Sequence, residues 1–177
     1  MPKATKKRRC YRYPKYDYGS AGWYFITINT ANFSQLFGRI ENGEMHLNPF
    51  GRIAQKEWLK TEQIRDNITL EEFIVKPDHF HAIISIDFPI NQSNLAGVFR
   101  STSQTVGAII RGYKGAVTKQ LKLYAQDNQI EGFPSKIWQR NYYDRIIRDE
   151  KELYNVKNYI LENPKWYRPR GRRNSDG

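Results

Sequence analysis

Two histidines, His79 and His81, are separated by one residue within the segment 73–86. In an extended strand successive side chains point to opposite faces, so both imidazoles project from one face. Phe80 and its alternate neighbours form the other face, which is apolar and suited to a core. The third histidine, His46, lies apart in a polar segment. The pair could hold a metal ion on a rigid strand, or it could be two strand histidines on an ordinary surface.

Two imidazoles leave a divalent ion undersaturated, so a metal site here needs a third protein donor from another element, with substrate oxygens completing the shell. Mg²⁺ or Mn²⁺ suits such a site when substrate phosphate supplies hard oxygen ligands. Structural zinc is disfavoured because Cys10 is the only cysteine and no third histidine adjoins the pair. A tyrosine phenol is one of the few side chains that can form a covalent intermediate with phosphate.

The chain has 177 residues, a formal net charge of +11 and 14% aromatic residues. Such a composition suits a polyanion with unstacked bases, because Lys and Arg displace phosphate counterions and aromatic rings stack on bases. A basic protein kept soluble by its charge is the alternative. The length predicts one folded domain, 21–167, between a basic N-terminal arm, 1–20, and a basic tail, 168–177. Single-cysteine usage and the lack of a long apolar run predict a cytoplasmic protein that does not enter membranes.

Aromatic and β-branched residues predict strands, and turn formers separate them. Strands are expected over 22–30, 37–40, 45–47, 68–75, 80–86 and 137–147, with an Asn-Gly turn inside 41–44. Helices are expected from Pro49 to about Arg65, with Asn48 as N-cap, and from about Leu95 to Tyr124. The second helix carries Arg111, Lys114 and Lys119, which could contact DNA or form a solvated basic face.

A last helix begins after Asp149, where Asp149 and Glu152 have the spacing of a capping box, and it ends before Pro164. Tyr159 and Asn163 are one turn apart and therefore share a face of this helix. A phenol and an amide would then meet the same neighbour. Tyr159 could equally be a packing tyrosine, because the chain contains 12 tyrosines.

Three blocks resemble the single-tyrosine HUH transposases, and among them the REP-associated tyrosine transposases. They are Lys76-Pro77-Asp78 followed by His79-Phe80-His81, the segment from Ile137 to Arg148, and the segment from Tyr159 to Pro164. The resemblance covers about residues 22–166. It implies an α+β fold, a ferredoxin-like α/β sandwich with the histidines on a central strand of an antiparallel sheet and the tyrosine on a helix beside it.

The resemblance also implies roles for individual residues. His79 and His81 match the metal-binding pair, Tyr159 matches the nucleophile, and Asn163 matches the polar residue that reaches the metal. The implied reaction is cleavage of single-stranded DNA: a metal-polarised phosphate is attacked by Tyr159, a 3′-hydroxyl leaves and a 5′-phosphotyrosine link forms. Another 3′-hydroxyl can then reseal the strand, which is DNA strand transfer.

The implied substrate is single-stranded DNA with hairpin-forming repeats, and the implied location is the nucleoid. The second block supplies five candidate DNA contacts: Trp138, Gln139, Arg140, Tyr142 and Arg145. The closer branch implies a monomer rather than a homodimer. The chain departs from the family at Asp78, where Asn is frequent; the carboxylate could tighten metal binding or cap the turn. Tyr142, Tyr143 and Tyr154 are rival nucleophiles, but none has a polar partner one turn on followed by a helix-ending proline.

Two other functions compete with the transposase. A non-catalytic or domesticated nucleic-acid-binding protein would use the basic and aromatic residues alone. A metal-dependent hydrolase would use the histidines to activate water, and would be indifferent to Tyr159→Phe. A replication initiator or conjugative relaxase is disfavoured because no helicase-like segment or third histidine adjoins the pair.

Overall fold

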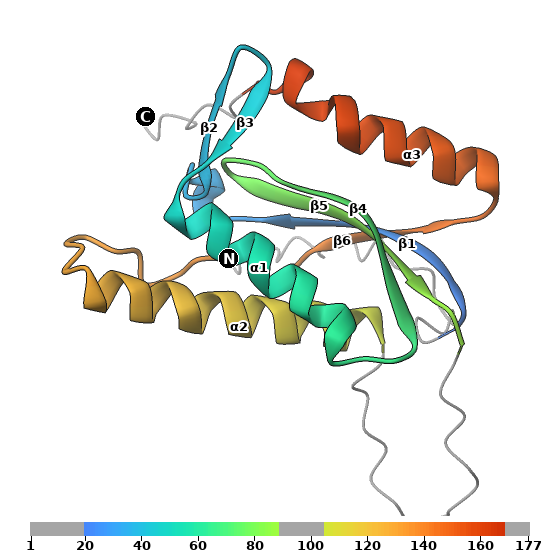
Figure 1. Ribbon diagram of the computed structural model, residues 1–177, viewed down its shortest axis with the longest axis horizontal. Coiled ribbons are helices and arrows are strands. Elements are labelled where there is room, and N and C mark those ends of the chain that lie inside the picture. Colours follow the sequence, from blue (N-terminus) through green and yellow to red (C-terminus); the bar gives the residue numbers. More distant parts are fainter. Residues whose placement is uncertain (1–19, 89–104, 169–177) are drawn as a thin grey trace, which may run out of the picture.

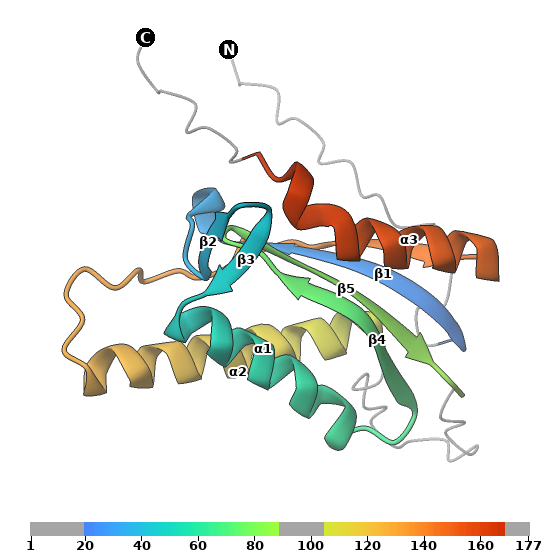
Figure 2. The same ribbon diagram turned by 45° about the horizontal axis from the view of Figure 1, so that its top comes forward.

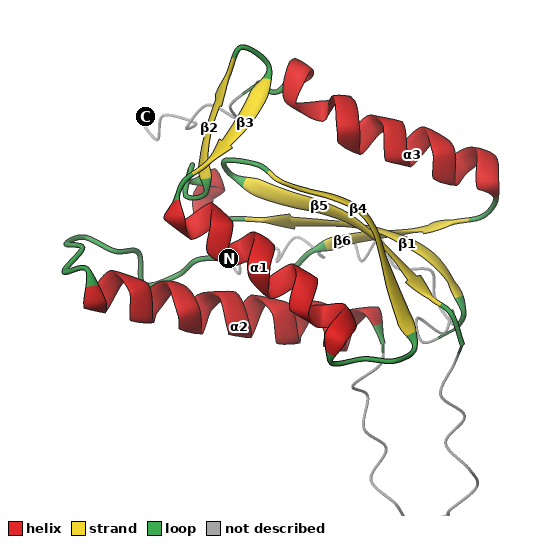
Figure 3. Cartoon of the chain, viewed as in Figure 1, coloured by secondary structure: helices red, strands yellow, loops and turns green. Residues whose placement is uncertain are grey.

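The structure is a computed structural model that describes residues 20–88 and 105–168 (Figure 1). Most of the predicted arm 1–20 and tail 168–177, with Cys10, therefore lies outside the described residues. The strands and helices are drawn in Figure 3. In chain order they are β1 (Gly22–Asn29), β2 (Gly38–Glu41), β3 (Glu44–Leu47), α1 (Pro49–Gln63), β4 (Ile68–Val75), β5 (His79–Ile86), α2 (Val106–Asp127), β6 (Tyr143–Ile147) and α3 (Glu150–Glu162), with short 3₁₀ turns at Ala31–Phe33 and Asn163–Trp166.

The central sheet has the strand order β4-β5-β1-β6, and each neighbouring pair is antiparallel. Helices α1 and α2 cover one face, and α3 lies on the other (Figure 2). The predicted α+β sandwich with a central antiparallel sheet is confirmed. No helix within residues 20–88 and 105–168 is long and apolar enough to cross a lipid bilayer.

Strand β1 shows how the sequence makes these layers. Tyr24, Ile26 and Ile28 are fully buried and pack in the main core with residues of α1 and α2, including Trp58. The alternate residues, among them Phe25, face the α3 side, as a two-residue period requires. A second, smaller core of Ile83, Ile147, Val156 and Ile160 joins α3 to the sheet. The apolar stripe of α3 therefore sets where its other residues stand.

Local turn and cap signals in the sequence are confirmed. Asn42 and Gly43 both have positive φ, at 51° and 79°, as a tight hairpin turn between β2 and β3 requires. Asn48 caps α1, with its Oδ1 accepting a hydrogen bond from the Gly51 amide at 2.9 Å. Asp149 caps α3 by accepting a hydrogen bond from the Glu152 amide at 2.7 Å.

The predicted strand 137–147 is wrong in its first half, because the strand begins only at Tyr143. Trp138 forms an isolated bridge with Thr30, and Tyr143 pairs with Thr27, so residues 139–142 stand opposite only residues 28 and 29 of β1 and cannot keep a regular register. The carbonyls of residues 139–141 are met instead by Lys114 Nζ from α2.

The second helix also differs from the prediction. Its described part begins at Val106, where Thr105 is the N-cap, and it ends at Asp127 rather than Tyr124. The predicted start near Leu95 lies outside the described residues.

Candidate active site

His79 and His81 lie at the start of β5 and face the α3 side of the sheet. Their ring centroids are 4.6 Å apart. His81 is buried, with 6% exposure, whereas the side chain of His79 is 17% exposed. The predicted placement of both imidazoles on one face is therefore found, on a strand flanked by β4 and β1.

Each histidine is oriented through Nδ1. Asp78 Oδ1 lies 2.5 Å from Nδ1 of His79, and Thr27 Oγ1 on β1 lies 2.9 Å from Nδ1 of His81. A carboxylate can only accept, so His79 donates from Nδ1, and in the neutral ring its lone pair is on Nε2. This is the arrangement in which a histidine presents Nε2 to a metal ion.

Asp78 is almost completely buried, with 2% exposure. The sequence left two roles open for its carboxylate, metal binding or turn capping. The structure shows a third arrangement, in which Asp78 stands behind His79 and holds its imidazole. Its backbone carbonyl also accepts hydrogen bonds from Thr30, which ties the turn before β5 to the end of β1.

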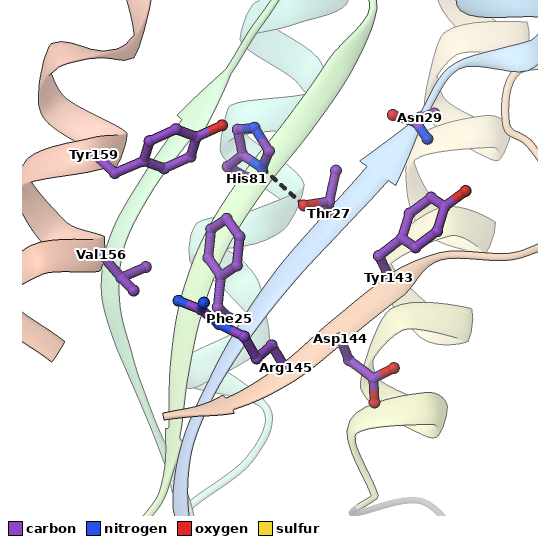
Figure 4. A pocket seen from close by; sticks show the side chains of 9 residues that line it. All are labelled: Phe25, Thr27, Asn29, His81, Tyr143, Asp144, Arg145, Val156 and Tyr159. Atoms are coloured by element: carbon purple, nitrogen blue, oxygen red, sulfur yellow. Dashed lines mark hydrogen bonds between the residues drawn. The ribbon is translucent and has the colours of Figure 1, made fainter. Parts of the chain in front are cut away.

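Tyr159 projects from α3 toward His81 (Figure 4). Its ring centroid is 5.6 Å from that of His81 and 6.1 Å from that of Phe25, and the side chain is 52% exposed. Tyr154, one and a half turns earlier on α3, is 66% exposed and does not line this cavity. Of the two rivals on the last strand segment, Tyr143 lines the cavity from β6 and Tyr142 packs against the main core.

Asn163 follows α3 directly and is buried, with 7% exposure. Its Oδ1 accepts a hydrogen bond from Lys76 Nζ, and its Nδ2 has no partner among the described residues. Lys76 is itself buried, and its Nζ lies 4.7 Å from the ring centroid of Tyr167. Burial lowers the pKa of Lys76 to about 8, although the negative charge of Asp78 acts to raise it. The amide of Asn163 is thus held to the turn that carries the histidines, and its predicted role as a metal ligand stays a prediction.

A cavity of about 560 Å³ adjoins His81 and Tyr159. Its floor comes from β1 and β6, and α3 forms one wall (Figure 4). The guanidinium of Arg145 supplies a positive charge to the cavity, and its Nη2 lies 3.4 Å from Oε1 of Glu152. The lining residues are Phe25, Thr27, Asn29, His81, Tyr143, Asp144, Arg145, Val156 and Tyr159.

The structure separates the candidate DNA contacts. Arg145 lines the cavity, and Arg140 is exposed shortly before β6. Arg111 and Lys119 are exposed on α2, which covers the opposite face of the sheet from Tyr159 (Figure 2). Arg111 and Lys119 therefore cannot touch a DNA strand that lies in the cavity.

The four remaining candidates are buried or half-buried. The prediction that Trp138 contacts DNA is wrong. This residue is 6% exposed and packs against Phe37 and Tyr113 in the main core, so it offers no surface on which a base could stack. Lys114 is half-buried under the carbonyls of residues 139–141, and burial lowers its pKa to about 8.

Tyr142 is half-buried, with its ring 6.0 Å from Lys114 Nζ. Gln139 is half-buried as well, and its backbone N–H donates a hydrogen bond to the backbone carbonyl of Asn29.

Sequence reasoning missed Thr27 and Asn29 on β1. Both share the two-residue period of Phe25, but nothing local shows which face of the sheet they take or which strand they adjoin. The register pairs Thr27 with His81 and Asn29 with His79. That pairing, which joins residues about 50 positions apart, brings them to the site.

A metal ion would have few charged ligands here. No cluster of three or more His, Cys, Asp or Glu with metal-binding geometry occurs within residues 20–88 and 105–168. The donor set, two imidazoles with fixed Nδ1 partners and a nearby amide, fits an ion that takes the rest of its shell from water or phosphate oxygens.

The antiparallel sheet, the histidine strand and the tyrosine helix define a sandwich of the transposase type. No family model matches the chain. A solved structure of a REP-associated tyrosine transposase bound to a REP hairpin has the same fold, with a TM-score of 0.55 and 19% identity over 90% of this chain and 72% of that one.

Two Haemophilus influenzae proteins are similar in sequence. An uncharacterized protein is 38% identical over 165 residues, which cover 89% of this chain and 88% of that protein. A protein named "putative REP-associated tyrosine transposase" is 31% identical over 93 residues, 51% of this chain and 46% of that relative. The chain thus spans less than half of the second relative. Together these findings confirm the resemblance to the REP-associated tyrosine transposases that the sequence shows: the fold is that of the solved transposase, and about half of the chain is similar in sequence to the second relative.

Proposed function

We propose that this protein cleaves single-stranded DNA and transfers the cut strand through a 5′-phosphotyrosine intermediate on Tyr159. The observation that carries the proposal is the meeting of Tyr159 on α3 with His81 on β5, ring centroids 5.6 Å apart, beside an open cavity. Helix and strand are far apart in sequence, and an exposed phenol next to the buried imidazole of His81 has no evident role in packing.

His79 and His81 would hold the divalent ion, Mg²⁺ or Mn²⁺, through Nε2. The contacts of Asp78 and Thr27 with the two Nδ1 atoms support this orientation, and for His81 it requires the Thr27 hydroxyl to accept from Nδ1–H. When bound, the ion supplies a positive charge that polarises a phosphodiester and stabilises its transition state. Asn163 is the protein's candidate third donor, and for this role its Oδ1 must accept from Lys76 and face the ion at the same time.

The reaction conserves the number of phosphodiester bonds. The Tyr159 phenol oxygen forms a bond to phosphorus, the bond from phosphorus to the 3′-oxygen breaks, and the leaving oxygen ends as a 3′-hydroxyl with the proton that the phenol gives up. A different 3′-hydroxyl reverses the step and frees Tyr159. The exposure of Tyr159 supports this role because a DNA strand must reach it from solvent.

The proposed substrate is DNA with hairpin-forming repeats. The net charge of +11 favours a phosphate backbone. The solved relative was bound to a REP hairpin, and we extend that substrate class to this chain as part of the proposal.

The test is a covalent adduct. Protein is incubated with Mg²⁺ or Mn²⁺ and end-labelled single-stranded DNA carrying its own flanking repeats, then run on a denaturing gel. We expect a labelled band at the mass of protein plus DNA, lost in Tyr159→Phe and in His79→Ala. Tyr154→Phe is the matched control, because it removes an exposed phenol from the same helix outside the cavity.

Other outcomes support the rival functions. Cleavage that continues in Tyr159→Phe with no adduct would indicate a hydrolase that activates water. Binding without cleavage for either ion and every repeat would indicate a DNA-binding protein without catalysis.

A further inference from the structure

The cavity extends well beyond Tyr159 and His81. Helix α3 packs over β4 and β5, whereas the face of β1 and β6 forms the cavity floor (Figure 4). The register places His81, Thr27 and Tyr143 side by side on three adjacent strands. With strands about 4.8 Å apart, Tyr143 stands roughly 10 Å from His81 across the sheet, within reach of a nucleotide next to one held at the histidines.

Asn29 is the unusual residue of this region. It is only 5% exposed as a whole, yet it lines the cavity. Figure 4 shows its amide at the cavity edge near Tyr143. An amide in this position can exchange hydrogen bonds with a ligand that fills the cavity.

The neighbours of Asn29 suit a nucleobase. Tyr143 is 53% exposed and offers a ring on which a base can stack. The Asn29 amide carries both donors and an acceptor, which lets it pair with the edge of a base. Arg145 and Phe25 complete the floor, one with a cation for phosphate and the other with an apolar ring.

We propose that Asn29 and Tyr143 form a nucleobase subsite, which binds an unpaired base of a nucleotide beside the scissile phosphate. Tyr143 stacks on the base and Asn29 reads its edge, so the subsite selects the sequence next to the cut. The inference rests on the proposed function for its substrate, single-stranded DNA. It assigns to β1 and β6 a role that neither the histidines nor Tyr159 perform.

The test measures binding apart from cleavage. Tyr159→Phe protein is titrated by fluorescence anisotropy into single-stranded repeat DNA in which one abasic site is moved along the strand. We expect one position where loss of the base weakens binding about tenfold. Adding Tyr143→Ala or Asn29→Ala should weaken binding of intact DNA by a similar factor and leave binding of that abasic DNA unchanged.

Two further variants make the result specific. Asn29→Asp keeps the size of the side chain but removes its donors, so it should change which base is preferred rather than unfold the protein. Tyr154→Ala, an exposed tyrosine outside the cavity, should behave like the parent. 2-Aminopurine at the sensitive position should lose its stacking-dependent quenching in Tyr143→Ala only.

The subsite is overturned if no abasic position weakens binding. It is also overturned if removal of the base weakens DNA binding of Tyr143→Ala and Asn29→Ala by the same factor as it weakens binding of the parent protein. This failure is distinct from failure of the proposed function, which the adduct on wild-type protein reports. If the adduct forms but no position is sensitive, the nuclease is supported and the subsite is refuted. If a position is sensitive but no adduct forms, the subsite is supported and the nuclease is refuted.

Discussion

Asp78 lies directly behind His79, with its Oδ1 2.5 Å from Nδ1 of the imidazole. The carboxylate is almost completely buried, so the hydrogen bond is shielded from competing water. One residue therefore fixes both the tautomer and the direction of its neighbour.

Removing this carboxylate should weaken metal binding. We expect Asp78→Ala to raise the Kd for Mn²⁺ about 10- to 100-fold, the usual cost of losing a partner behind a ligating histidine. Asp78→Asn keeps an acceptor for Nδ1 and should lose less. Titration calorimetry on each variant measures this, with the exposed Asp66→Asn as control. Equal Kd values for Asp78→Ala and wild type would contradict the role of Asp78.

A lysine anchors α3 two residues before Tyr159. Lys157 Nζ lies 2.6 Å from Glu71 and 3.0 Å from Glu72 on β4, and its hydrogen bond to Glu71 raises its pKa. We expect Lys157→Met to cost about 0.5–1 kcal/mol of unfolding free energy, because the pairs are partly exposed.

Adduct formation should fall more than this stability change explains, since Tyr159 is positioned by the same helix. Urea denaturation and the adduct assay on Lys157→Met and on the exposed Lys151→Met separate the two effects. The anchoring role is contradicted if the two variants form adduct at the same rate.

Two helical glycines should respond oppositely to alanine. A Cβ on Gly51 would lie 2.2 Å from the Phe37 carbonyl oxygen, whereas one on Gly115 would meet nothing within 4 Å. We expect Gly51→Ala to destabilise the protein by about 2 kcal/mol or more, through forced separation of α1 from the chain before β2. Gly115→Ala should add up to about 1 kcal/mol through helix propensity. Thermal unfolding of both variants checks the prediction, and a stabilised Gly51→Ala would refute it.

Lys114 should make stability depend on pH. Burial lowers its pKa from 10.5 to about 8 in the folded chain, so between these values the unfolded state binds more protons. Stability linked to Lys114 therefore rises as the pH increases from about 8 toward 10.5. Between pH 8 and 9.5 we expect wild type to gain on the order of 1 kcal/mol relative to Lys114→Met. Urea unfolding across this range tests the sign; parallel pH profiles would contradict it.

Much of the fold could be predicted because its signals are local. The hairpin turn follows from Asn42 and Gly43, because these residue types adopt positive φ at low cost. Asn48 and Asp149 mark the starts of their helices because their side chains cap the first turn. The strand 137–147 failed because its residues have strand character but no continuous partner. Residues 139–142 stand opposite only residues 28 and 29 of β1, and no property of residues 137–142 reveals this mismatch in register.

The sequence by itself determined that His79 and His81 share a face, because side chains alternate along any extended chain, and that a capped helix carries Tyr159 and ends next to Asn163. Only the tertiary structure decided which tyrosine meets the histidines, that Trp138 is core rather than surface, and that Thr27 and Asn29 belong to the site. The reason is physical: periodicity and caps depend on neighbours in the chain, whereas strand register and the packing of α3 depend on contacts between residues far apart in sequence.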